Sequence, residues 1–179
     1  MPTAACWASP SLVTSTGRGE LVEFGPWLGC STFFIIEGLN GNPNFNGHKL
    51  HVYDDFVWQI AWMNRRVDES ERLKNHQDVQ PFFEKYAAPF LHHLTVEKRM
   101  IAPYDGNENL LQLAWNGRPI EMVYVDCGRT REVNEAWHSI MSGFLGRICG
   151  VYHTSMTHRL PCPENRHRGK DFRGGALAG

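Results

Sequence analysis

The segment from Glu20 to Leu39 constrains the fold more strongly than any other part of this 179-residue chain. It begins with a short apolar run typical of a buried strand and ends with an amphipathic pattern typical of a helix. Gly25 and Gly29 lie between them, and glycine allows a turn of the main chain to approach a ligand closely. The segment therefore predicts the first strand and helix of an open α/β sheet, with a ligand crevice at the turn.

The start of the predicted helix supports a ligand at the same place. Ser31 or Thr32 stands where a helix N-cap is expected, so the free N–H groups of the first turn would face the crevice. Anionic parts of a nucleotide-like ligand favour such a helix end. The turn does not match the pyrophosphate-binding pattern G-x-G-x-x-G, because Trp27 occupies the place of the second glycine. No G-x-x-x-x-G-K-[ST] loop is present either, which leaves a nucleoside triphosphate site unsupported.

Composition favours one domain with a core and excludes several kinds of partner. The chain is 42% hydrophobic with a formal net charge of −1, which gives no reason to expect nucleic acid or an anionic membrane as partner. No apolar run approaches the length that crosses a bilayer. The five cysteines are scattered without a C-x-x-C pair, which predicts free thiols in a reducing cytoplasm. The expected partner is a small-molecule substrate, and the oligomeric state is left open.

Strand and helix patterns alternate along the chain, which predicts an α/β fold with a mainly parallel sheet. The predicted strands are Glu20–Gly25, Lys49–Asp54, Leu94–Ile101, Ile120–Asp126 and Ile148–Tyr152. The predicted helices are Ser31–Leu39, Pro81–His93, Asn109–Trp115 and Arg129–Ser142. Three regions follow from this division: a flexible arm over residues 1–19, a ligand-binding domain over residues 20–157, and an irregular basic tail over residues 158–179.

Two stretches are assigned to structure rather than to binding. The charged run Arg65–Lys74 is predicted to be a solvated helix face or a mobile loop, with no part in a binding surface. The aromatic residues spaced by four, Phe82, Tyr86 and Phe90, are predicted to pack in the core. Trp58 and Trp62 are also expected in the core, although they follow Asp54 closely enough to flank an adenine.

Polar residues stand at the ends of the predicted strands. In open α/β sheets ligands bind beyond the carboxyl ends of the strands, and Glu23, Asp54, Asp126 and His153 fall at that edge. Asp54 could accept hydrogen bonds from both hydroxyls of a ribose, or it could serve as a turn or helix N-cap acid. Asp55 competes with Asp54 for the ribose role. His153 is the candidate general base, because its reference pKa suits proton transfer near neutral pH.

The strand ending in Glu23, with Gly25, Gly29 and Ser31, resembles motif I of class I S-adenosylmethionine-dependent methyltransferases, a Rossmann-like family. Val125-Asp126-Cys127-Gly128-Arg129 is similar to the acid-bearing string that ends strand four in that family. The resemblance covers roughly residues 20–153 and includes the catechol-type, metal-dependent O-methyltransferases. It implies a Rossmann-like open sheet with helices on both faces. The implied reaction is methyl transfer to a hydroxyl or amine of a small molecule, such as a sugar or a secondary metabolite.

The resemblance also implies roles for individual residues. Ser31 and the turn amides would hold the methionine end of the cofactor, Asp54 its ribose, and Asp126 would be a first metal ligand or a substrate-side acid. The full predicted cofactor-binding set is Glu23, Gly25, Trp27, Gly29, Ser31 and Asp54, and the predicted catalytic pair is His153 and Asp126.

Departures from the family pattern limit these expectations. Metal-dependent members carry an Asp after strand five, where this chain has His153-Thr154, and one remaining carboxylate is a poor magnesium site. A bound divalent metal is therefore not expected. Arg129 stands at the position of the family's base and cannot lose its proton near neutral pH. The zinc-compatible residues His153, His158, Cys162 and His167 match no compact zinc motif.

The residues after the last predicted strand offer no pattern for the β-hairpin with which a methyltransferase sheet normally ends. We therefore expect a chain that is C-terminally truncated or that changes reading frame near Met156. Two alternatives to an active methyltransferase stay open. One is a degenerate or truncated relative without activity, and the other is a nucleotide-binding α/β module, against which Trp27 argues.

Overall fold

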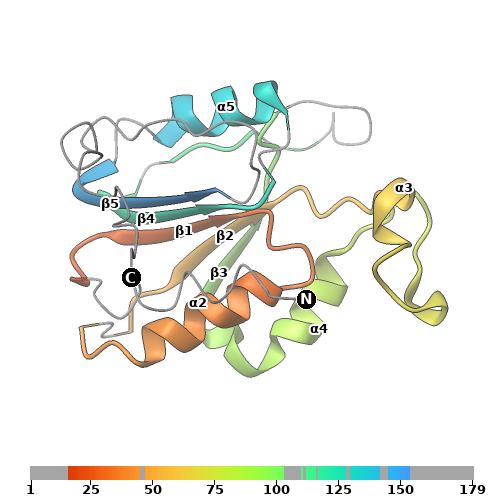
Figure 1. Ribbon diagram of the computed structural model, residues 1–179, viewed down its shortest axis with the longest axis horizontal. Coiled ribbons are helices and arrows are strands. Elements are labelled where there is room, and N and C mark those ends of the chain that lie inside the picture. Colours follow the sequence, from red (N-terminus) through yellow and green to blue (C-terminus); the bar gives the residue numbers. More distant parts are fainter. Residues whose placement is uncertain are drawn as a thin grey trace, which may run out of the picture.

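A five-stranded parallel sheet forms the centre of the molecule, with the strands in the order β3-β2-β1-β4-β5 (Figure 1). The computed structural model describes residues 16–44, 47–102, 110, 112–115, 117–127, 130–141 and 145–153, the last range by its main chain alone. The strands are β1 (Glu20–Phe24), β2 (Leu50–Asp54), β3 (Leu94–Lys98), β4 (Ile120–Val125) and β5 (Leu145–His153). This order is that of a Rossmann-like sheet and confirms the predicted fold class. The predicted absence of a terminal hairpin concerns residues outside the described ranges.

Helices cover both faces of the sheet, as the alternating pattern predicted. α2 (Cys30–Asn40) and α4 (Gln80–Ala87) lie on one face, and α5 (Arg131–Met141) lies on the other (Figure 1). The remaining helical segments are α3 (Ile60–Met63), η2 (Glu69–Glu71) and η3 (Ala88–His93). The chain passes from β1 outward through β2 to β3 and returns to β4 beside β1, so the strand order reverses between β1 and β4. Such a switch point is where ligands bind in sheets of this type.

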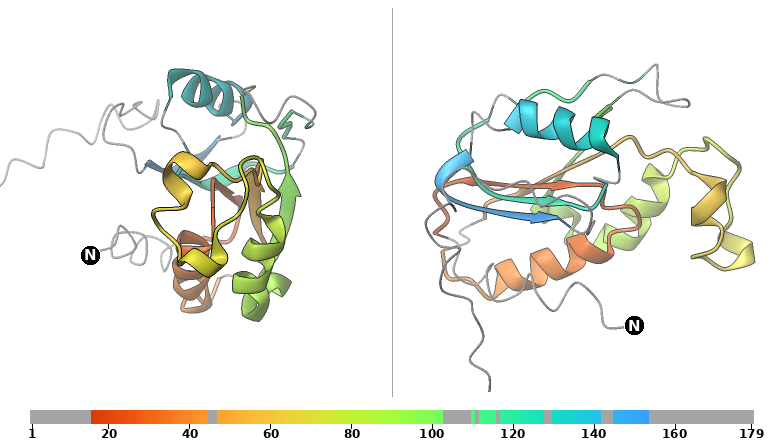
Figure 2. Two further views of the ribbon diagram at one scale, coloured as in Figure 1. Left: turned by 90° about the vertical axis from the view of Figure 1, so that its right-hand side faces the viewer. Right: turned by 45° about the horizontal axis from the view of Figure 1, so that its top comes forward.

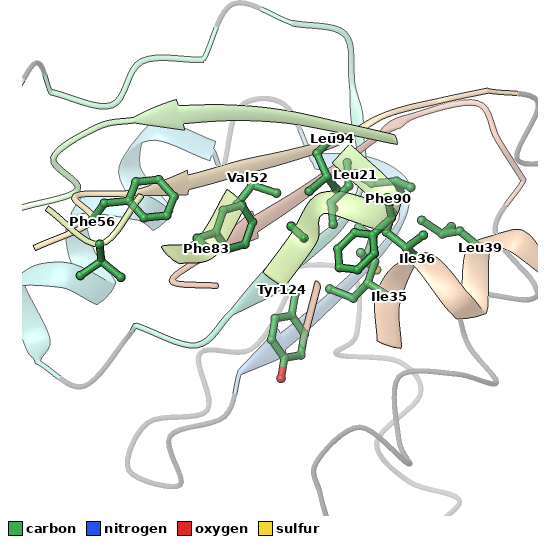
Figure 3. Packing of buried hydrophobic residues seen from close by; sticks show 14 of the residues in the cluster. Leu21, Ile35, Ile36, Leu39, Val52, Phe56, Phe83, Phe90, Leu94 and Tyr124 are labelled. Carbon is green, nitrogen blue, oxygen red and sulfur yellow. The ribbon is translucent and has the colours of Figure 1, made fainter. Parts of the chain in front are cut away.

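Alternation along β1 divides the core into two layers. Leu21 faces the cluster shared with α2 and α4, whereas Val22 and Phe24 face the cluster shared with Trp137 of α5. The first cluster combines aliphatic side chains of α2 with Val52, Phe83 and Phe90, as Figure 3 shows. Both layers are closely packed and hold the ends of β1, β2 and β4 in fixed positions.

Residues 56–79, here called the 56–79 loop, leave and re-enter the body at one point. Val57 pairs with Asp78 in an antiparallel bridge, and Trp58 exchanges main-chain hydrogen bonds of 2.8 Å with His76 and Gln77. The stem is anchored in the core, since Trp58 and Val79 are each 1% exposed. α3 and η2 lie on the outer part of the loop, which stands in front of the carboxyl ends of the strands (Figure 2).

Some predicted elements differ from those observed. Gln112–Trp115, predicted to be helical, instead form a bridge from Gln112 to Met100 followed by irregular chain. The predicted helix Pro81–His93 is divided into α4 and η3. Tyr86 is 40% exposed, so its predicted core role is wrong, and the neighbouring Phe83 is fully buried in its place. A helix of eight residues turns only one face to the sheet, and Phe83 rather than Tyr86 lies on it.

The end of the predicted N-terminal arm is held against the sheet. The main-chain N–H groups of Thr16, Arg18 and Gly19 donate to the carboxylate of Glu121 on β4. The rest of the predicted arm and the whole predicted basic tail lie outside the described residues. Among the helices that are described, none has the length and apolar character needed to span a membrane.

Candidate functional site

A pocket of about 980 Å³ opens at the carboxyl edge of the sheet, across the switch point between β1 and β4. Its floor comes from the residues that follow three neighbouring strands: Gly25 after β1, Asp54 and Asp55 at the end of β2, and Asp126 and Cys127 after β4. The 56–79 loop supplies one wall, and the start of α5 supplies another. The volume suits a small organic ligand or cofactor.

The turn after β1 requires glycine at Gly25. Its φ of 76° lies in the left-handed region, and a Cβ there would come within 2.7 Å of the Cβ of Cys127. The Gly25 N–H donates to the carbonyl of Tyr53 at 3.0 Å, which keeps β1 and β2 together to their ends. Trp27 also has a positive φ, 50°, although it is not a glycine. The turn thus approaches Cys127, the second residue after β4, closely, and its approach to a ligand stays a prediction.

The start of α2 differs from the prediction. Gly29 is the N-cap residue, and no side chain caps the helix, so the N-cap role expected for Ser31 or Thr32 is wrong. Both hydroxyls instead donate to the carboxylate of Glu23, at 2.5 Å from Ser31 and 2.7 Å from Thr32. Glu23 is fully buried. Because a buried carboxylate needs hydrogen-bond donors, the two hydroxyls bind Glu23 and do not cap the helix.

Glu23 fixes α2 to the end of β1 from behind the pocket. Burial raises the pKa of the Glu23 carboxyl to about 7, against the opposing effect of the two hydroxyl hydrogen bonds. Among the described lining residues, the turn contributes Gly25 and Trp27, but not Glu23, Gly29 or Ser31. Glu23 therefore holds the helix start in position and does not face the cavity.

Asp54 lies half-buried in the floor of the pocket and closes two turns. Its Oδ1 accepts the Phe56 N–H at 2.7 Å, and its carboxyl group also accepts the main-chain N–H of Trp27. Burial and the adjacent Asp55 carboxyl raise the pKa of Asp54 well above its usual range. The sequence left two roles open for Asp54, ribose binding and a turn or helix N-cap acid. The structure shows the turn acid. Asp54 also faces the cavity, where a sugar hydroxyl could reach it.

Asp126 and Cys127 complete the floor after β4. The Asp126 N–H donates to the carbonyl of Phe24 at 2.9 Å, which ties this position to the end of β1. Burial raises the pKa of the Cys127 thiol, and the carboxylates of Asp54 and Asp126 add to the effect. The main chain of His153 pairs with Val125 at the end of β5. The register therefore brings its backbone to the predicted edge, while its side chain lies outside the described part of the chain, as do Arg129, His158, Cys162 and His167.

An aromatic pair forms one side of the pocket. The rings of Trp27 and Trp62 lie 5.2 Å apart between centroids, at an angle of 51°. The Trp27 indole N–H is buried and has no acceptor among the described residues. Trp58 is a core residue, as expected, and its indole N–H donates to Asn64 Oδ1 at 2.7 Å. The sequence offered Trp58 and Trp62 as residues that could flank an adenine. Of these two, Trp62 alone lines the pocket.

The sequence did not indicate Arg65 and Arg66 as pocket residues. They were assigned to a solvated surface, yet both line the cavity from the turn that follows α3. Their position depends on the closure of the 56–79 loop, which has no local pattern of its own. Their closeness in sequence to Trp62 was the one signal that could have suggested it.

No three His, Cys, Asp or Glu side chains gather as a metal site in the part of the chain that the structure describes. The absence of a metal stays a prediction, since the side chain of His153 and the residues after it are not included. Comparison with protein-family models and with curated protein sequences finds no match for this chain.

Proposed function

We propose that this protein binds S-adenosylmethionine in the pocket and transfers its methyl group to a hydroxyl or amine of a small molecule. One observation carries the proposal: the glycine turn after β1 and the acid that ends β2 face the same cavity at the switch point. A cofactor with the carboxylate of an amino-acid end and a ribose requires both groups together.

The proposed placement assigns the ribose to Asp54 and the adenine to the wall formed by Trp27 and Trp62. A half-buried carboxylate is a strong acceptor for sugar hydroxyls, and an indole offers a flat apolar surface for a base. The methionine end would lie at the turn, near the start of α2. Gly25 has no side chain to obstruct it.

The reaction needs alignment more than acid–base chemistry. The acceptor atom forms a bond to the methyl carbon while the carbon–sulfur bond breaks. The electron pair of the broken bond stays on sulfur, which becomes a neutral thioether. If the acceptor is a hydroxyl, its proton must leave, and Asp126 is the candidate among the described pocket residues. His153 stays the second candidate from the sequence. Enclosure by the 56–79 loop would exclude water.

Calorimetric titration with S-adenosylmethionine, with its demethylated product S-adenosylhomocysteine and with NAD tests the proposal. We expect both sulfur compounds to bind and NAD not to bind, because Trp27 obstructs a pyrophosphate. Binding of NAD alone would favour the nucleotide-binding alternative. A folded sample that binds none of the three would favour the degenerate relative.

A second experiment tests the site by substitution. Gly25→Val is unsuitable, because any Cβ at this position meets Cys127 and would disturb the fold. Asp54→Asn keeps an acceptor for the Phe56 N–H but removes the charge, and we expect weaker binding of S-adenosylhomocysteine. Asp55→Asn tests the competing acid, and Asp68→Asn, exposed on the 56–79 loop, is the matched control. Equal affinity in the Asp54 variant and the control would refute the assignment.

We also propose that the protein works in a reducing compartment such as the cytoplasm. Cys30 and Cys127 are both free thiols near the pocket, and Cys127 lies in its floor. The exposed thiol of Cys30 would be open to oxidation in an oxidising compartment.

A further inference from the structure

We infer that Arg65 and Arg66 recognise an oxyanion group, a carboxylate or a phosphate, on an aromatic methyl acceptor. The inference rests on the proposed function and names the substrate class for the same pocket. The pocket wall carries its arginines on the 56–79 loop and its carboxylates at the end of β2, after β4 and, through Glu132, on α5.

The two arginines have no ion-pair partner among the described residues, and unlike Arg18, Lys49, Lys74 and Lys85, which also have none, they line the pocket. Arg72, Lys98, Arg99, Arg118 and Arg131 each pair with a carboxylate of this chain. Within the described residues, Arg65 and Arg66 form no such pair, and no other lysine or arginine lines the pocket. Two arginines that follow each other in the sequence and both line a cavity are suited to a planar or tetrahedral oxyanion.

Buried residues hold the backbone that carries the arginines. The indole of Trp58, 1% exposed, donates to the side chain of Asn64, the residue directly before Arg65. The Arg65 N–H donates to Trp62 at 3.2 Å, and the Arg66 N–H donates to Met63 at 2.9 Å. The arginine pair therefore extends from a turn that is fixed by the core, although both side chains reach solvent.

The remaining walls indicate what lies beside the oxyanion. The carboxylates Asp54, Asp55 and Asp126 lie on the sheet edge, where they would repel an anion. Apart from the tryptophan wall assigned to the adenine, the cavity is lined by the apolar side chains of Phe56, Met63 and Ile101. A ligand that satisfies this arrangement has a flat apolar body and one anionic end, with that end at the 56–79 loop.

Matched pairs of acids and neutral analogues test the inference by titration calorimetry with saturating S-adenosylhomocysteine. The probes are 3,4-dihydroxybenzoate against its methyl ester, and phenyl phosphate against phenol. We expect the anion of at least one pair to bind about tenfold or more tightly than its neutral analogue. The pair that shows the difference tells a carboxylate site from a phosphate site.

The variant Arg65→Ala/Arg66→Ala should lose that preference, with the acid falling to the affinity of the neutral analogue. The neutral analogue and S-adenosylhomocysteine should bind as in the wild type, which also shows that the variant is folded. Arg72→Ala is the matched control, because Arg72 lies on the same loop, pairs with Glu69 and does not line the pocket. It should bind the acid as the wild type does.

Several results would overturn the inference: no anion bound by the wild type, equal affinity for acid and neutral analogue, or an equal loss in the Arg72 variant. If the double variant lost affinity for S-adenosylhomocysteine, the arginines would be assigned to cofactor binding. That result would also overturn the inference. If the wild type binds the acids through Arg65 and Arg66 but does not bind S-adenosylhomocysteine, the oxyanion site stands and the proposed function fails.

Discussion

The pKa values of carboxyl groups at the two edges of the sheet are shifted in opposite directions. At the carboxyl edge, burial raises the pKa values of Glu23 and Asp54, and the latter lies beside a second carboxyl group. At the amino edge, Glu20 binds Arg118 at 2.7 Å and His51 at 3.2 Å. Burial acts against ionisation of Glu20 as well, but hydrogen bonds from these two partners outweigh it and lower its pKa.

Strained backbone, like the carboxyl groups with raised pKa values, lies at the carboxyl edge of the sheet. Of the three described non-glycine residues with positive φ, Trp27 and Phe56 lie at the carboxyl edge and line the pocket, and His76 lies on the 56–79 loop. The amino edge also has a hollow, of about 450 Å³, but the carboxylate that lines it is already neutralised by Arg118. Strained backbone and carboxylates with raised pKa values gather at functional sites, where they cost stability. The fold therefore concentrates its unfavourable features at the edge proposed to bind a ligand.

Alanine at two glycines with positive φ gives the largest expected contrast between the edges. Gly25→Ala should lower the free energy of unfolding by about 3 kcal/mol or more, because strain adds to a Cβ contact of 2.7 Å with Cys127. Gly47, at the amino edge, has a similar φ of 74°, and no described atom lies within 4 Å of the added Cβ. Gly47→Ala should cost only about 1 kcal/mol. Urea unfolding measures both, and equal losses would remove the contrast.

The pH dependence of stability should reflect the buried acid at the carboxyl edge. The pKa of Glu23 is about 7 in the folded protein and 4.5 for an unperturbed glutamate, so the folded state binds more protons between these values. The contribution is complete below pH 4.5 and is lost as pH rises through 7, which amounts to about 3 kcal/mol. Glu23→Gln should lack this fall when unfolding is followed from pH 5 to pH 8. Parallel profiles for the two proteins would contradict the raised pKa.

Glu20 provides the opposite sign for the same experiment. Because its pKa is lowered in the folded state, its contribution is present above pH 4.5 and is lost as pH falls below that value. Glu20→Gln should therefore lower the free energy of unfolding by a constant amount above pH 6, without changing the slope there, and should lack the fall on the acid side of the profile.

Thiol reactivity should separate two residues that line the same pocket. Cys30 is exposed, whereas burial and nearby carboxylates raise the pKa of Cys127. Iodoacetamide at pH 8 should modify Cys30 roughly tenfold or more faster than Cys127, as followed by peptide mass spectrometry. Saturating S-adenosylhomocysteine should slow both reactions if it fills the pocket. Equal rates without ligand would show that the carboxyl edge is more open than described.

The smallest effect is expected at the amino edge. Arg118→Ala removes a partner of Glu20 but leaves His51 in contact with it, and the arginine side chain is 64% exposed. The loss in unfolding free energy should stay below about 1 kcal/mol, since exposed ion pairs contribute little. A loss as large as that of Gly25→Ala would contradict the division between the edges.

The sequence predicted the sheet well because each strand carries its own local pattern. Largely apolar runs such as Leu21–Phe24 indicate burial on both faces, and Asp54 and Asp126 mark the edge at which β2 and β4 end. Parallel pairing then brings Gly25, Asp54 and Asp126 to one pocket without further information. The central part of the candidate site was thus predictable from local signals.

The features that were missed depend on contacts between distant residues. Ser31 and Thr32 are residue types typical of N-caps. Both hydroxyls instead donate to the buried carboxylate of Glu23, eight residues before Ser31. Arg65 and Arg66 reach the pocket only because the ends of the 56–79 loop pair through Val57 and Asp78. Neither a capping preference nor a run of charges carries that information.

The paired stem of the 56–79 loop separates the evolution of specificity from that of the fold. The chain enters and leaves the loop at one antiparallel bridge outside the sheet, so the exposed residues of the outer loop can change in charge without altering the register of any strand. The outer loop is in this sense an exchangeable module on a constant base. Replacing it should redirect what the pocket accepts while the glycine turn and Asp54 stay as they are.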